Sequence, residues 1–211
     1  MPSLLKSSQK PEPKMVREFK HTPPKERLDS LPALVRDFKW RWPRHRRDTV
    51  VTYAAGALNL QDAIYRAVMS RTAQGKMHNH QSRVPTKSLR AYAVRLKNKA
   101  HVDVWASGRP KIHSFDQLYD ICWNLRIKGI GVVTVYDVAT RIGAYLGLEP
   151  DSLYLHAGVL DGARELGVVN GDRAPVRIPL AALPRPLHSL TADECEDFLC
   201  AYRGMLGAVR R

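Results

Sequence analysis

The chain has 211 residues, of which 44% are apolar and 8% aromatic, a composition typical of a globular protein that can bury a sizeable core. No apolar run approaches the roughly 18 residues of a membrane span, and the first residues lack the apolar core of a signal peptide, so we expect no membrane contact and no export. The three cysteines form neither an even set nor a CxxC pair, which argues against a disulfide framework and indicates reduced thiols in a cytoplasmic protein.

The net charge of +14 is concentrated in the first half of the chain. Residues 1–111 hold 24 Lys and Arg against 8 Asp and Glu, whereas residues 112–211 hold 10 against 12. A basic excess of this kind promotes salt-sensitive association with the phosphates of nucleic acid. A solubilising surface or a site for an acidic protein would carry the same charge. We favour nucleic acid as the partner, which would make the protein nucleoid-associated if it is bacterial.

Residues 1–30 are rich in Ser, Pro, Lys and Glu with little periodic apolar content, so the sequence predicts a disordered basic tail. In residues 31–48, basic side chains alternate with Phe38, Trp40 and Trp42. The candidate nucleic-acid contacts in this stretch are Arg41, Arg44, Arg46 and Arg47. Its aromatic rings could stack on bases, or they could anchor the arm to the fold and leave the charges in solvent.

Residues 48–71 place apolar side chains at helical spacing, which predicts a long helix broken near Gly56 and Asn59. Its apolar face would comprise Leu58, Ala63, Ile64, Ala67 and Val68. A polar loop is predicted for residues 72–85. It contains His78 and His80, but this pair lacks a third ligand at a recognisable spacing, so we expect no metal site and no cofactor.

A helix capped by Thr86 is predicted over residues 86–100. Its apolar positions repeat at helical steps, which places Arg90 and Lys97 on the outward face. We count both as candidate nucleic-acid contacts. Residues 101–105 alternate between apolar and polar side chains, and we expect a brief extended segment there.

A capping box of Ser114 and Gln117 predicts the start of a helix over residues 115–126. A turn at residues 127–131 then leads into a second helix over residues 134–146. The predicted arrangement is therefore two helices joined by a tight turn.

The end of the chain has similar local signals. A second capping box, Thr191 with Glu194, predicts a terminal helix over residues 191–207. Before it, residues 176–186 contain too many prolines for a helix and should wrap the surface.

The turn between the two central helices reads Gly-Ile-Gly, from Gly129 to Gly131. Glycine permits positive φ and brings the main chain close to a partner. Free amides at the start of the second helix could then hold a phosphate oxygen, helped by the helix dipole. The alternative is a glycine turn between two core helices that binds nothing.

From Ile127 the chain reads I-K-G-I-G-V-V-T-V-Y-D-V-A, which resembles the helix-hairpin-helix motif of DNA repair proteins. Lys128 stands where many members of that family have proline, and Val135 where they prefer alanine. The resemblance implies a contact with DNA phosphates. The residues that it assigns to this contact are Lys128, Gly129, Ile130, Gly131, Val133 and Thr134.

The resemblance extends to the helix-hairpin-helix DNA glycosylases, of which endonuclease III is a familiar kind. Asp151 follows Gly131 by 20 positions, the separation at which that family places its catalytic aspartate. The resemblance implies that Asp151 stabilises the cation formed when the N-glycosidic bond of a flipped base breaks. Val133 stands where lyase-competent members carry a nucleophilic lysine, so the implied activity is monofunctional. Asp151 is equally suited to be the N-cap of the next helix.

Two residues close to Asp151 are candidates for a substrate pocket. Tyr154 could stack against a base, or it could be an aromatic residue of the core. His156 could carry a proton or contact a substrate, or it could be a packed helix residue.

Together these patterns predict a mainly α-helical protein, a helical bundle that contains a helix-hairpin-helix motif behind a disordered basic tail. We expect residues 31–211 to form a single domain with a basic half, residues 31–111, and a hairpin-containing half, residues 112–211. The predicted function is DNA binding, with monofunctional DNA glycosylase activity as its enzymatic form. A non-catalytic DNA- or RNA-binding module is the alternative.

Overall fold

The computed structural model describes residues 28–42, 53–54, 56–70, 77, 79–99, 105–106, 109–170 and 176–209. The described chain is mainly helical, as predicted, and none of its helices is long and apolar enough to cross a membrane. Several predictions fall outside the described residues: the tail up to residue 27, Arg44, Arg46, Arg47, His78 and the side chain of His80.

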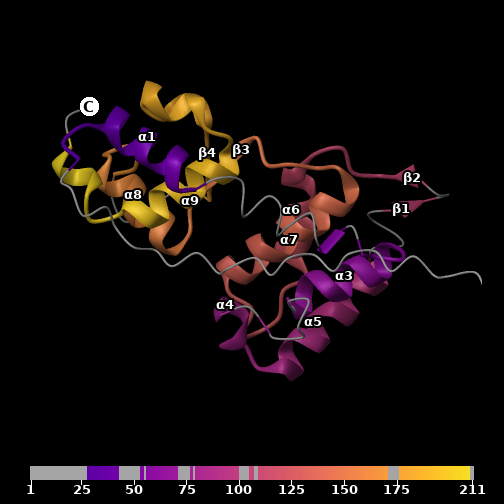
Figure 1. Ribbon diagram of the computed structural model, residues 1–211. Helices are drawn as coiled ribbons and strands as arrows, with labels where there is room; N and C mark the ends of the chain where they lie inside the picture. Colours follow the sequence, from indigo (N-terminus) through magenta and orange to yellow (C-terminus); the bar gives the residue numbers. More distant parts are fainter. Residues whose placement is uncertain are drawn as a thin grey trace, which may run out of the picture.

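The helices gather in two lobes around separate hydrophobic clusters (Figure 1). The first, which we call the α7 lobe, holds α3 (Leu60–Met69), α4 (Asn79–Ser82), α5 (Thr86–Lys99), α6 (Phe115–Asn124) and α7 (Val132–Leu146). The second, the α9 lobe, holds α1 (Leu31–Arg41), α8 (Ala157–Glu165) and α9 (Ala192–Tyr202). Short 3₁₀ helices at Leu180–Ala182, Arg185–Ser189 and Leu206–Ala208 complete the α9 lobe.

Two short antiparallel strand pairs accompany the helices: β1 (Trp105–Ala106) with β2 (Arg109–Pro110), and β3 (Ser152–Tyr154) with β4 (Arg177–Pro179). Successive side chains of a strand point to opposite sides. In and just after β3 this alternation sends Leu153 and Leu155 into the cluster of the α9 lobe and Tyr154 into that of the α7 lobe. The β3 segment therefore links the two cores.

Helix α7 is the central helix of its lobe, because it packs against both α3 and α6. One of its buried residues is charged: Arg141 is 8% exposed. Its Nη1 donates to the carbonyl of Ala67 at 3.1 Å and to Oε1 of Gln81 at 3.0 Å, and its Nη2 lies 3.6 Å from Oδ2 of Asp137. Arg141 thus ties α7 to α3 and α4.

Helix α1 packs onto the end of the chain. Phe38 contacts Phe198 edge to face at 5.6 Å between ring centroids, and the Tyr202 hydroxyl donates to Oδ2 of Asp37 at 2.5 Å. Leu31 and Leu34 are fully buried in the same cluster. The α9 lobe therefore combines α1, from the basic half of the sequence, with α8 and α9, from the hairpin-containing half. The two lobes do not correspond to these two halves.

Two helix starts in the α7 lobe differ in detail from the predictions. Asn59 caps α3 by accepting from the amide of Asp62 at 3.0 Å, so the predicted break near Asn59 is confirmed, but Leu58 is 87% exposed and lies outside the apolar face. The predicted cap Thr86 is wrong, because α5 begins at Thr86 itself and the carbonyl of Pro85 accepts from the amide of Leu89. Residues 79–82 of the predicted loop form the short helix α4.

The capping box predicted for α9 is confirmed, whereas that for α6 is confirmed only in its Ser114 cap. Ser114 Oγ accepts from the amide of Gln117 at 3.2 Å, although the Gln117 side chain accepts from His113 rather than returning to Ser114. At α9 both contacts of the box between Thr191 and Glu194 are present.

The region after α7 differs most from the prediction. Asp151 caps no helix: it immediately precedes β3, and the N-cap position of α8 belongs to His156. The cap interpretation of Asp151 is therefore wrong. The proline-rich stretch forms β4 and two 3₁₀ helices, which leave most of it exposed or half-buried but bury Ile178 and Leu183.

Candidate nucleic-acid interface

The turn between α6 and α7 is built around a glycine in the left-handed region. Gly129 has φ of +92°, a conformation that other residues adopt only at a cost. The carbonyl of Ile127 accepts from the amide of Ile130 at 3.0 Å, which closes the turn. Because Ile130 is only 5% exposed and joins the core of the α7 lobe, the turn is anchored beneath while Lys128 and Gly129 face solvent.

Helix α7 begins without a capping side chain. Its N-cap residue is Gly131, in an extended conformation with φ of −85°, and the carbonyl of Gly131 accepts from the amide of Val135 at 3.0 Å. Within the described residues, no acceptor is present for the amides of Gly131, Val132, Val133 and Thr134. Gly131 is exposed, Val132 and Val133 are half-buried and Thr134 is buried, so the outermost amides are the ones that solvent can reach.

A second helix begins close to this turn. A Cβ placed on Gly129 would lie 3.8 Å from Oγ of Ser88, in the first turn of α5. The starts of α5 and α7 therefore lie near each other. Each carries the partial positive charge of a helix N-terminus, and their effects on an anion between them add.

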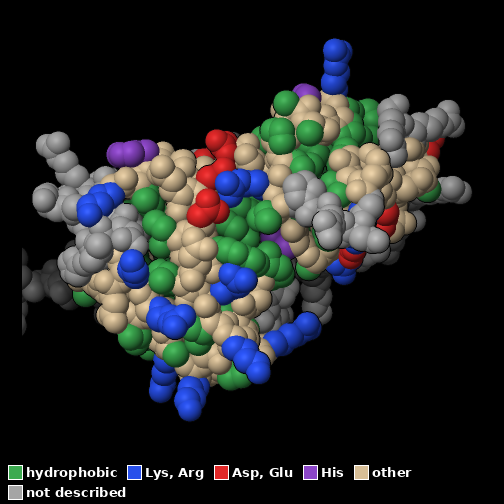
Figure 2. All heavy atoms as spheres, turned by 180° about the vertical axis from the view of Figure 1, so that it is seen from behind, with side chains coloured by type: hydrophobic (Ala, Val, Ile, Leu, Met, Phe, Trp, Pro, Cys, Tyr) green, Lys and Arg blue, Asp and Glu red, His purple; other side chains and the backbone are tan. Residues whose placement is uncertain are grey.

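Basic side chains lie along the whole of α5 and at the α6–α7 turn. Helix α5 contains no acidic residue and carries Lys87, Arg90, Arg95, Lys97 and Lys99. The turn adds Arg126 and Lys128, both exposed. Figure 2 shows Lys and Arg side chains spread over the lower part of the α7 lobe, with the acidic side chains of this face gathered higher up, towards the α9 lobe.

The two nucleic-acid candidates on α5 differ in their surroundings. Arg90 is exposed, whereas Lys97 is half-buried and its Nζ lies 5.0 Å from the centre of the Tyr65 ring. The carbonyl of Lys97 also accepts from the side chain of Gln61 at 3.1 Å. Lys97 therefore helps to hold α3 against α5.

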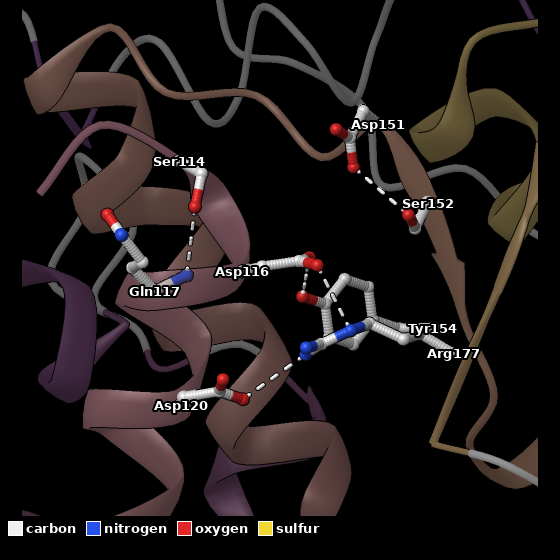
Figure 3. A network of polar contacts seen from close by, with 8 residues as sticks. All are labelled: Ser114, Asp116, Gln117, Asp120, Asp151, Ser152, Tyr154 and Arg177. Atoms are coloured by element: carbon white, nitrogen blue, oxygen red, sulfur yellow. Dashed lines mark hydrogen bonds and ion pairs between the residues drawn. The ribbon is translucent and has the colours of Figure 1, made fainter.

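Where the two lobes meet, a polar network fastens β3 and β4 to α6 (Figure 3). The Tyr154 hydroxyl donates to Oδ1 of Asp116 at 2.5 Å, and Nε of Arg177 lies 3.0 Å from Oδ2 of the same carboxylate. Nη1 of Arg177 reaches Oδ1 of Asp120 at 3.2 Å. Burial, together with the bond to Asp116, raises the pKa of Tyr154, so its hydroxyl stays protonated. Sequence reasoning missed this network.

The two substrate-pocket candidates are both buried. Tyr154 is 1% exposed, within the core of the α7 lobe. His156 is 5% exposed: its ring lies 4.9 Å from that of Tyr136, and its Nε2 is 3.7 Å from Oε1 of Glu196. His156 is packed, as one interpretation expected, but at the N-cap position rather than inside a helix.

Asp151 is exposed and stands apart from the Asp116–Tyr154–Arg177 network in Figure 3. Its carboxylate accepts from Oγ of Ser152 at 3.0 Å. Within the described chain, no group of three His, Cys, Asp or Glu side chains could hold a metal ion.

The aromatic residues of α1 divide between the two roles that the sequence allowed. Trp42 stacks on Phe38 at 5.3 Å between ring centroids and so anchors the helix, whereas Trp40 is 78% exposed. Nε of Arg41 bonds Oδ1 of Asp37 at 2.7 Å. Arg41 lies in the α9 lobe, whereas the α6–α7 turn lies in the α7 lobe. These two groups of predicted nucleic-acid contacts are therefore in different lobes.

Comparisons of this chain with protein-family models, with curated proteins and with solved structures found no match.

Proposed function

We propose that this protein binds nucleic acid, DNA by preference, and that the α6–α7 turn acts as a helix-hairpin-helix. The observation that carries the proposal is the open start of α7: the exposed amide of Gly131 and those of Val132 and Val133 have no acceptor among the described residues. A helix N-terminus of this kind favours a phosphate oxygen, through both its free donors and its dipole.

The charge around the turn supports a polyanion rather than a single small anion. Arg126 and Lys128 flank the open amides, and the exposed Arg90 and Lys87 extend the positive surface along α5. Successive phosphates of one strand could meet the turn and then this helix. Contacts of that kind hold the backbone without reading sequence, so we expect affinity to depend strongly on salt.

The geometry supports binding more than catalysis. Asp151 is exposed, and the hydrogen bond that its carboxylate accepts among the described residues comes from the neighbouring Ser152. Glycosylase chemistry at Asp151 therefore stays a prediction from the resemblance, and the proposal does not depend on it.

The experiment fills the open start of α7 from within the protein. Gly131 has an extended backbone, and a Cβ there would meet no atom within 4 Å, so Gly131→Asn can supply a capping side chain without a clash. The matched control, Gly131→Ala, adds a Cβ but no acceptor. Fluorescence anisotropy with a labelled DNA duplex, and with an RNA duplex of the same sequence, reports affinity between about 50 and about 200 mM salt.

We expect Gly131→Asn to weaken DNA binding about tenfold, because the new side chain competes with phosphate for a charge-assisted hydrogen bond worth about 1.5 kcal/mol. Gly131→Ala should bind nearly as the natural chain does. Equal affinity in all three proteins would remove the turn from the interface. Affinity that does not change with salt would exclude a phosphate contact altogether, and tighter binding of the RNA duplex would reverse the assigned preference.

A further inference from the structure

Helix α1 turns an aromatic side chain towards solvent. Trp40 is 78% exposed, although the ring two positions further on, Trp42, is stacked on Phe38. Residues two positions apart lie about 200° apart around a helix axis, so packing of Trp42 on the lobe directs Trp40 away from it. The guanidinium of Arg41 lies 5.8 Å from the centre of the Trp40 ring, at the outer limit of a cation–π contact, and leaves most of the ring open.

Two cations share the outer face of α1 with Trp40. Arg36 lies one helical turn before both Lys39 and Trp40, and side chains three or four positions apart are neighbours on a helix surface. Arg36 and Lys39 are both exposed. Among the described residues, no carboxylate pairs with either cation: the only acidic residue of α1, Asp37, bonds Arg41 at 2.7 Å. The face around Trp40 is therefore positively charged.

The make-up of this face decides which kind of partner it fits. Within the described residues, Trp40 is the only large apolar side chain that α1 exposes. A membrane surface or a protein partner would require a wider apolar patch. A single flat ring beside two cations instead matches one nucleotide, because the base can stack on the ring while its phosphates meet the positive side chains.

We propose that the outer face of α1, formed by Arg36, Lys39 and Trp40, binds an unpaired nucleotide of a nucleic acid, with its base stacked on Trp40. The inference rests on the proposed nucleic-acid binding but not on the α6–α7 turn, which lies in the other lobe. The turn contacts phosphates, which paired and unpaired strands both carry. Trp40 requires the open face of a base, so it adds a preference for single-stranded positions.

The experiment compares three labelled DNA probes with the full chain at one salt concentration: oligothymidine, an abasic strand of the same length, and a fully paired duplex. The two single strands carry the same charge, so the ratio of their affinities isolates the contribution of the bases. Fluorescence anisotropy should show that the natural protein binds oligothymidine about tenfold more tightly than the abasic strand, the size of one stacking contact.

Trp40→Ala should bring this ratio close to one and leave the affinity for the duplex unchanged, because paired bases have no open face. Trp40→Phe keeps an aromatic ring and should retain most of the ratio. Leu58→Ala is the matched control, since Leu58 is 87% exposed and lies outside α1, and it should keep the full ratio. Thermal unfolding verifies folding, and neither alanine variant should lower the Tm.

The two cations are tested through salt. Replacing both Arg36 and Lys39 by glutamine should weaken the binding of oligothymidine and of the abasic strand alike. In a plot of log affinity against log salt concentration, the slope should become shallower by about 1.4, which is about 0.7 for each of two phosphates on a single strand. An unchanged slope would remove the two cations from the interface.

The outcomes separate this proposal from that of the turn. If Trp40→Ala keeps the ratio, or weakens the duplex as much as oligothymidine, the base contact on α1 is overturned, and the effect of Gly131→Asn on the duplex still decides the turn. If Trp40→Ala abolishes the ratio while Gly131→Asn changes nothing, the turn falls and the α1 contact stands. If none of the probes binds, both proposals fall, and Trp40-dependent binding to anionic phospholipid vesicles would then assign this face to a membrane.

Discussion

Helices α7 and α9 are each buried in the core of one lobe, yet they begin in opposite ways. At α9 the side chains of Thr191 and Glu194 each take a backbone amide, so two of the donors of the first turn are satisfied within the chain. At α7 the corresponding position is Gly131, which has no side chain to offer, and four successive amides have no acceptor among the described residues. The start of α9 is closed by its own side chains, whereas the start of α7, which we assign to a ligand, is open.

An uncapped helix stays in place only if it is held elsewhere, and α7 is held near its other end. Gly147 is in the left-handed region with φ of +72°, and its amide donates to the carbonyl of Gly143. The amide of Leu148 donates to the same carbonyl at 2.8 Å. Together with Arg141, these contacts fix the C-terminal half of α7, so its N-terminus can stay free for a partner.

The largest expected effect tests whether α7 is held in place by contacts away from its N-terminus. Arg141→Met removes a buried guanidinium and leaves Asp137 and Gln81 without it, so we expect the free energy of unfolding to fall by about 3 kcal/mol. Urea denaturation measures the loss. Arg95→Met, at an exposed position of α5, is the control and should change stability by less than about 0.5 kcal/mol. Equal losses in the two variants would show that α7 does not depend on this anchor.

The next effect compares how the buried thiols of the two cores make stability depend on pH. Burial raises the pKa of Cys122 in the α7 lobe and of Cys195 in the α9 lobe from 9.0 to about 12. A thiol that binds its proton more tightly in the folded state stabilises fully below pH 9, and this contribution is lost as pH rises towards 12. Stability measured at increasing pH should therefore be flat below pH 9 and then fall.

Replacing either cysteine by alanine should remove a similar part of this alkaline loss. If only one variant changes the dependence of stability on pH, the thiol of the other lobe is not shielded from solvent.

A smaller effect compares the two helix starts directly. Thr191→Ala removes the cap of α9 and should cost about 1 kcal/mol, whereas Gly131→Ala at α7 has no cap to remove and should change stability by only a few tenths. Gly131→Asn should be the more stable of the two Gly131 variants by about 1 kcal/mol. The same denaturation assay gives all three values. A loss at Gly131→Ala as large as that at Thr191→Ala would mean that the start of α7 is not open.

The smallest effect concerns Asp151. Because it is exposed and caps no helix, Asp151→Asn should change stability by less than about 0.5 kcal/mol and leave DNA affinity unaltered. An assay for base release from modified duplexes accompanies the binding measurement. Base release that disappears in the variant would restore the glycosylase interpretation.

Local signals in the sequence were sufficient for α3, α6 and α9 and for the caps of α6 and α9. The cap at Ser114 and the box at Thr191 depend on contacts three residues apart, and the apolar spacing of α3 and α6 depends on one helical face. The turn with Gly129 and Gly131 was also found from the sequence, because positive φ and an uncapped helix start both call for glycine.

The errors came from contacts between distant segments. Pro150 and Asp151 look locally like a helix start, but Ser152–Tyr154 pairs instead with Arg177–Pro179, and this pairing keeps the chain extended. The network of Asp116, Tyr154 and Arg177 joins α6 to β3 and β4, so no local pattern contains all of its members. Trp40 and Trp42 stand two residues apart, and only the position of the helix on α9 decides which of them is buried.

The contact between Asp37 and Tyr202 spans 165 residues and imposes an order on folding during synthesis. Helix α1 leaves the ribosome early, but the apolar face that holds Leu31, Leu34 and Phe38 finds its partners only after α9 has emerged. The cluster of the α7 lobe ends at Tyr154 and can condense much sooner. A nascent chain stalled before Ala192 would therefore present a nearly finished α7 lobe together with an uncovered α1, the kind of surface that chaperones hold.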